Sequence, residues 1–122
     1  MWLFTRFGFF SVVAHNSQPR HLLVRARMPG DLEALKAGYL AELGPIAETP
    51  DHDYRFRASV EGDAFAAAVG RVASDISYTN FKDEVHRVQG AQRAGWYAEV
   101  WSILSEMQDR HMTRKENPNG KE

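Results

Sequence analysis

The chain has 122 residues, 43% of them hydrophobic and 25% charged, a composition typical of globular proteins and not of disordered or collagenous ones. Its 15 Lys and Arg residues nearly balance 16 Asp and Glu residues, so the net charge of −1 favours neither nucleic-acid nor membrane-surface binding. The sequence contains no cysteine, which excludes disulfides, thiol catalysis and cysteine-bound metals and fits a cytoplasmic protein.

The first 28 residues predict three β-strands. Residues 2–6 and 9–15 are rich in aromatic and β-branched side chains and are separated by Gly8, and residues 21–28 follow a polar loop. The apolar residues of this opening lie on both sides of Arg6, unlike those of a signal peptide. No apolar run reaches the roughly 20 residues of a membrane span. We therefore expect an antiparallel meander and no membrane segment.

Helical and extended patterns follow each other in the rest of the chain. A helix is predicted from an N-cap at Asp31 to residue 43, with Gly44-Pro45 ending it. A loop, residues 46–53, leads to a fourth strand at residues 54–60. Three helical stretches come next: residues 63–76, a short helix capped by Asn80, and residues 91–108.

The order β-β-β-α-β-α-α predicts an α+β fold, a two-layer sandwich in which a mainly antiparallel sheet of four or five strands carries helices on one face. We expect one domain over residues 1–112. The tail, residues 113–122, is polar and contains Pro118 and Gly120, so it is predicted to be disordered.

Strand periodicity assigns side chains to the two faces of the sheet. The side chains expected to meet the helices are Leu22, Val24, Ala26 and Met28, together with Tyr54, Phe56, Ala58 and Val60. The opposite face receives four arginines: Arg25, Arg27, Arg55 and Arg57.

The four arginines suggest a bound anion. If residues 21–28 and 54–60 are neighbouring strands, the two pairs face each other at about 5 Å, and like charges so placed are destabilising. Guanidinium groups match phosphate or carboxylate oxygens in pairs, so a small anionic ligand would offset this cost. Alternatively, carboxylates such as Glu99 and Glu106, or those of a partner subunit, balance the arginine charges. In a further alternative the guanidinium groups are simply solvated, and the arginine stems cover Leu23 and Val13.

Two further features bear on ligands. The segment Tyr78-Thr79-Asn80-Phe81-Lys82 precedes a helix N-terminus, where Lys82 could reach an anion; alternatively Asn80 caps the helix and Lys82 is solvated. A nucleic-acid-binding module on the sheet is a further alternative. The sequence argues against it, because the expected open-face aromatics are few, Phe9 and one of Trp2 or Phe4, and the net charge is near zero.

The last helix is apolar over a wide arc. Such aromatic-rich surfaces are favoured at protein interfaces, so we expect a homodimer. Alternatively, the helix lines a deep groove in the monomer or is a plain core helix, and self-association uses the open face of the sheet. The residues of the predicted interface are Trp96, Val100, Trp101, Ile103, Leu104 and Met107.

No catalytic signature is present, and we assign no catalytic residue, no cofactor and no metal site. An enzyme acting on a phosphorylated or carboxylated metabolite is the alternative to a binding or interaction domain. Its acid-base groups would come from four residues: His15, His21, Tyr78 and Glu84.

Several short motifs resemble a family of small bacterial proteins of unassigned function. They are the opening MWLFT with GFFS, the segment Tyr78-Thr79-Asn80-Phe81-Lys82, and the later Gly90, Arg93, Tyr97 and Val100-Trp101. The resemblance covers most of the chain up to residue 108. It implies a compact domain, and it brings no activity or site residue.

Overall fold

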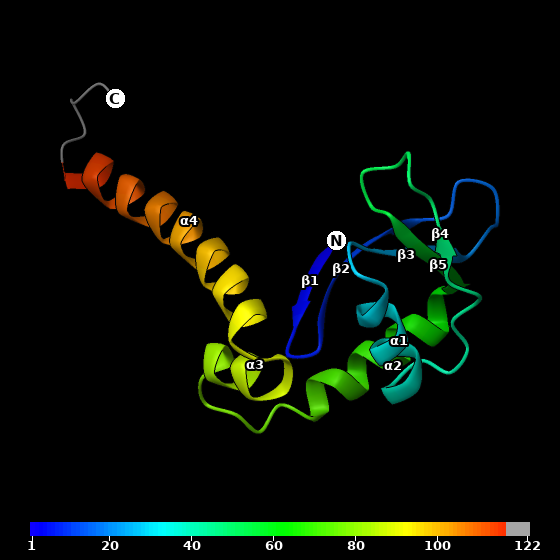
Figure 1. Cartoon of the computed structure of the whole chain (residues 1–122). Coiled ribbons are helices and arrows are strands. Elements are labelled where there is room, and N and C mark those ends of the chain that lie inside the picture. Colours follow the sequence, from blue (N-terminus) through cyan, green and yellow to red (C-terminus); the bar gives the residue numbers. More distant parts are fainter. Residues whose placement is uncertain (117–122) are drawn as a thin grey trace. The chain divides into compact units, whose positions relative to one another are not determined.

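The computed structural model describes residues 1–116, which form two compact units, Met1–Thr79 and a second that starts at Asn80 (Figure 1). The first unit contains five strands and the helices α1 and α2. The second contains α3 and α4. The predicted α+β class is confirmed, with one additional short strand. All four predicted helical stretches are present, one more than the order β-β-β-α-β-α-α counts. The prediction of one domain over residues 1–112 stays a prediction.

The sheet of the first unit is antiparallel, with the strand order β1-β2-β3-β5-β4. Its strands are β1 (Trp2–Thr5), β2 (Gly8–Ala14), β3 (His21–Ala26), β4 (Ala47–Glu48) and β5 (Phe56–Glu61). The meander and the fourth predicted strand are therefore confirmed. The added strand, β4, lies in the segment that was predicted to be a loop.

Helices α1 (Pro29–Gly38) and α2 (Gly62–Ser74) cover one face of this sheet and form its second layer. Between the layers lies a core of side chains whose spacing along each strand has period two, as expected when one face is buried. The core residues are Phe10, Val12, Val24, Ala26, Leu32, Leu35, Leu40, Leu43, Ala58, Val60, Phe65 and Ala68.

Helix α1 differs from its prediction at both ends. It begins at Pro29 with Met28 as N-cap, because proline presets the backbone angle of a first helical turn. The predicted cap, Asp31, lies inside that turn, and its Oδ2 accepts a hydrogen bond from the Phe9 amide at 3.0 Å. The helix ends at Gly38 and not at residue 43. The chain then turns, which brings Leu40 and Leu43 into the core.

The second unit is a helical pair joined at Gly90, whose φ of 93° favours glycine. Helix α3 (Phe81–Gln89) is capped as predicted, since Asn80 Oδ1 accepts from the Asp83 amide at 3.0 Å. Helix α4 (Ala91–Glu116) continues past its predicted end at residue 108. Residues 113–116 of the predicted tail are helical, and residues 117–122 lie outside the described residues.

Candidate functional site

Two of the four predicted arginines stand directly opposite each other. Arg25 on β3 and Arg57 on β5 are cross-strand partners in the sheet register. Arg25 Nη2 donates a hydrogen bond to Ser11 Oγ at 2.7 Å. Arg57 donates from Nε to Thr49 Oγ1 at 3.1 Å and from Nη2 to the Tyr54 carbonyl at 3.2 Å. Both guanidinium groups therefore donate hydrogen bonds to neutral oxygens of the chain.

The ring of Tyr54 packs against two of the arginines. Its ring centroid lies 4.7 Å from the guanidinium carbon of Arg25 and 4.3 Å from that of Arg27, and the side chain is 4% exposed. The prediction that Tyr54 faces the helices is therefore wrong, because β5 begins at Phe56 and strand alternation does not extend to residue 54. Met28 was likewise assigned to the core face, but it is the α1 N-cap and is exposed.

The outer two arginines have separate partners. Arg27 Nη1 donates to the Asp53 carbonyl at 2.9 Å, and Arg55 Nε donates to Glu48 Oε1 at 2.9 Å in an exposed ion pair. Glu48 is thus a carboxylate paired with one of these arginines. Glu99 and Glu106 belong to the second unit, and their pairing with the arginines stays a prediction. The Arg25 Nε is buried and makes no hydrogen bond within the described residues. An anionic ligand on this face stays a prediction.

Aromatic side chains extend the arginine face toward β1. Phe4 and Phe9 are cross-strand partners whose rings stack at 4.4 Å, and Trp2 meets Phe9 edge-on at 5.8 Å. Phe9 in turn lies 6.5 Å from Tyr54. Both Trp2 and Phe4 are therefore on this face, where one of them was expected. Trp2 is 68% exposed, so this end of the face is open to solvent.

Lys82, the fifth predicted anion ligand, lies in the second unit. Its Nζ is 4.6 Å from the ring centroid of Trp101, a cation–π contact between α3 and α4. Next to it, Phe81 stacks on Tyr97 with centroids 5.8 Å apart. These two contacts fix α3 against one side of α4, and they give Trp101 of the predicted interface a partner within the unit.

The remaining predicted interface residues form an apolar stripe on α4. Between 36% and 65% of each side chain is exposed. With about 100° between successive helical residues, these side chains fall on one face, roughly a quarter turn from the side that α3 contacts. The stripe, called the α4 stripe below, consists of Trp96, Val100, Ile103, Leu104 and Met107.

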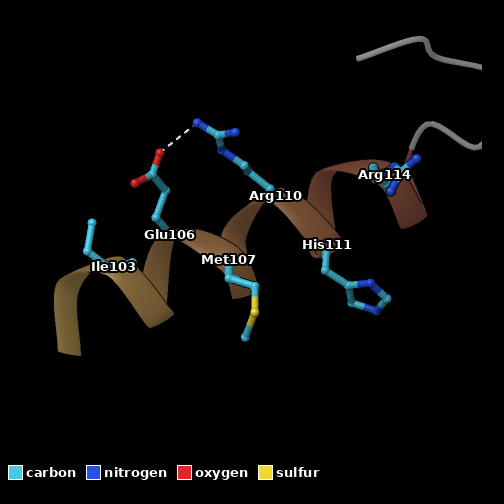
Figure 2. Close-up of a pocket in the computed structure, with 6 residues that line it drawn as sticks. All are labelled: Ile103, Glu106, Met107, Arg110, His111 and Arg114. Carbon is cyan, nitrogen blue, oxygen red and sulfur yellow. Dashed lines mark hydrogen bonds and ion pairs between the residues drawn. The ribbon is translucent and has the colours of Figure 1, made fainter. Parts of the chain in front are cut away.

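A hollow in the α4 surface adjoins the stripe toward the C-terminus (Figure 2). Glu106 Oε1 accepts from Arg110 Nη2 at 2.7 Å, an i,i+4 ion pair on its rim. Met107 and His111 point to another side of the helix in this view. The lining residues are Ile103, Glu106, Met107, Arg110, His111 and Arg114.

Of the four candidate acid-base residues, His15 and His21 line one pocket at the loop before β3, where the His15 amide donates to the His21 carbonyl at 2.9 Å. Tyr78 belongs to the first unit and Glu84 to the second. His15 Nδ1 accepts from the Ser17 and Gln18 amides at 3.2 and 3.1 Å, which closes the loop before β3. Glu84 is buried, and both of its carboxylate oxygens accept hydrogen bonds from Arg87, at 2.6 and 3.0 Å. Within residues 1–116 no three His, Asp or Glu side chains are placed to hold a metal ion.

No family model, curated protein or solved structure matches this chain. The resemblance to a family of small bacterial proteins therefore stays a prediction. In the part of the chain that the structure describes, no helix combines the length and apolar character needed to cross a membrane.

Proposed function

We propose that this protein is a small interaction domain that self-associates as a homodimer through the α4 stripe. The observation that carries the proposal is the exposure of large apolar side chains in one place: Ile103 is 65% exposed and Met107 is 64% exposed. Contiguous apolar surface of this kind marks interaction sites in globular proteins. The lack of cysteine supports a cytoplasmic location for the domain.

The dimensions of the two helices show how little of α4 its neighbour α3 can cover. Helix α4 has 26 residues, and α3 has 9. At about 1.5 Å per residue, α4 is roughly 39 Å long and α3 roughly 14 Å. A helix as short as α3 covers about a third of α4. Burying a side chain such as Ile103 in an interface contributes on the order of 1 kcal/mol or more. Trp96 adds an aromatic anchor of the kind found at binding hot spots.

Light scattering tests the proposal directly. The chain has a mass of 13.9 kDa, and light scattering should give about twice that mass. Dilution should release monomer. Ile103→Glu places a charge in the stripe and should raise the dimer dissociation constant on the order of 100-fold. Ser102→Glu adds the same charge on the other side of α4 and should leave the dimer intact. A monomeric wild-type chain at 100 µM, about a hundred times a micromolar constant, would refute the proposal.

A further inference from the structure

The α4 stripe continues along the helix with the spacing of a coiled-coil seam. Six positions follow each other at alternating steps of four and three residues, which gives the 3.5-residue period of a heptad seam. Four are apolar and the last two are basic: Trp96, Val100, Ile103, Met107, Arg110 and Arg114. A straight seam of this kind fits another helix.

The hollow beside the stripe is lined by residues at the spacing that this packing uses. In knobs-into-holes packing, each hole is formed by four residues at i, i+3, i+4 and i+7. The lining of the hollow contains two such sets in succession, residues 103, 106, 107 and 110 and residues 107, 110, 111 and 114 (Figure 2). The Glu106–Arg110 ion pair spans the first set at 2.7 Å and fixes its rim. Two knobs from a facing helix can therefore enter.

We infer that α4 pairs with α4 of a second copy in the antiparallel direction. This inference rests on the proposed self-association and adds its geometry. In a parallel pair, Arg110 would face Arg110 of the other copy, and Arg114 would face Arg114, which places like charges in the seam. In an antiparallel pair, the basic end of each helix meets the apolar beginning of the other.

The register follows from the positions of charged and apolar residues. Ile103 and Val100 of one copy enter the two holes of the other, so that Ile103 packs against Met107. Trp96 then lies at the level of Arg114, where a guanidinium over the indole face gives a cation–π contact. Sliding the helices by one heptad step would instead bring Arg93 against Arg110 of the other copy. Charge repulsion therefore disfavours a slide in that direction, and a slide in the other direction would lose the contact between Trp96 and Arg114.

Cysteine cross-linking tests this geometry, because the natural chain has no cysteine. Two single-site variants, Glu99→Cys and Thr113→Cys, place thiols beside opposite ends of the seam. They are mixed in equal amounts and oxidised, and the disulfide-linked peptides are identified by mass spectrometry. We expect links between positions 99 and 113 to exceed links between identical positions at least tenfold. In the register above, Glu106→Cys should link to its own copy.

The outcomes separate the inference from the function on which it rests. Links between identical positions 99–99 and 113–113 would overturn the antiparallel pairing and leave self-association in place. A dimer by light scattering that forms neither kind of link would overturn the α4 contact itself. Reduced variants that are monomeric, together with a monomeric wild type, would overturn both proposals.

Discussion

The ring of Tyr54 contacts two cations, with the guanidinium carbons of Arg25 and Arg27 at 4.7 and 4.3 Å from its centroid. This contact explains how a sheet face with an Arg25–Arg57 cross-strand pair is tolerated. Each cation lies against the electron-rich face of an aromatic ring or against oxygens of the chain, so direct repulsion is offset.

Tyr54→Ala should therefore destabilise the first unit by about 3 kcal/mol, the cost of removing a buried aromatic side chain together with its cation–π contacts. Urea unfolding followed by tryptophan fluorescence measures this change. Tyr54→Phe keeps the ring and should stay within about 0.5 kcal/mol of the wild type. Equal destabilisation by both substitutions would show that the hydroxyl, and not the ring, matters.

Sulfate tests whether an anion occupies the arginine face. Because Arg25, Arg27, Arg55 and Arg57 already have partners within the chain, we expect 10 mM sulfate to leave the melting temperature unchanged relative to chloride at equal ionic strength. A specific ligand would raise it, as binding to the folded state always does. An increase lost in Arg25→Ala would support the predicted anion site.

Features set by neighbouring residues could be predicted from the sequence. Asn80 as the α3 cap depends on a residue three positions away, and the buried faces of β3 and β5 follow from alternation. The apolar arc of α4 was visible for the same reason. The exposed Trp96 and Met107 are the part of that arc on which the proposed dimer depends.

Contacts across long stretches of chain could not be predicted. The Phe9–Asp31 and Tyr39–Asp75 hydrogen bonds join residues 22 and 36 positions apart, and each depends on how the helices lie on the sheet. Tyr54 was misplaced because nothing local shows that the strand starts two residues later. Its ring packs against Arg25 and Arg27, which come from β3 and the residue after it, a distant part of the chain.

Gly8 is required because Asp31 packs on the backbone at that position. A Cβ added at Gly8 would lie 2.8 Å from both Cβ and Cγ of Asp31, closer than real side chains approach. Gly8→Ala should destabilise the protein by about 2 kcal/mol, since the buried carboxylate that binds the Phe9 amide would have to move. Thermal unfolding measures the effect.

Gly70→Ala is the matched control for that substitution. Gly70 lies within α2, and a Cβ there meets nothing within 4 Å. Alanine should stabilise the helix by about 0.5–1 kcal/mol, because it reduces the freedom of the unfolded chain. If the two variants changed stability in the same direction, the contact with Asp31 would not be the cause of the Gly8 effect.

The Tyr39–Asp75 hydrogen bond should make stability depend on pH in the alkaline range. Tyr39 donates to Asp75 Oδ2 at 2.6 Å, and this bond, with burial, raises the pKa of the phenol above its ordinary 10.0 even though Arg6 acts in the opposite direction. The unfolded chain therefore loses this proton first. The stabilisation is complete below pH 10 and is lost as the pH rises through the folded-state pKa.

Tyr39→Phe should accordingly cost about 1 kcal/mol at pH 8, and the difference from the wild type should shrink above pH 10. Urea unfolding of both proteins between pH 8 and 11 provides the measurement. In an Asp75→Asn background the main cause of the raised pKa is gone, so the Tyr39→Phe effect should vary much less with pH. A difference that stayed constant through pH 11 in the natural background would contradict this role of the hydrogen bond, because ionisation of Tyr39 would then be the same in the folded and unfolded chains.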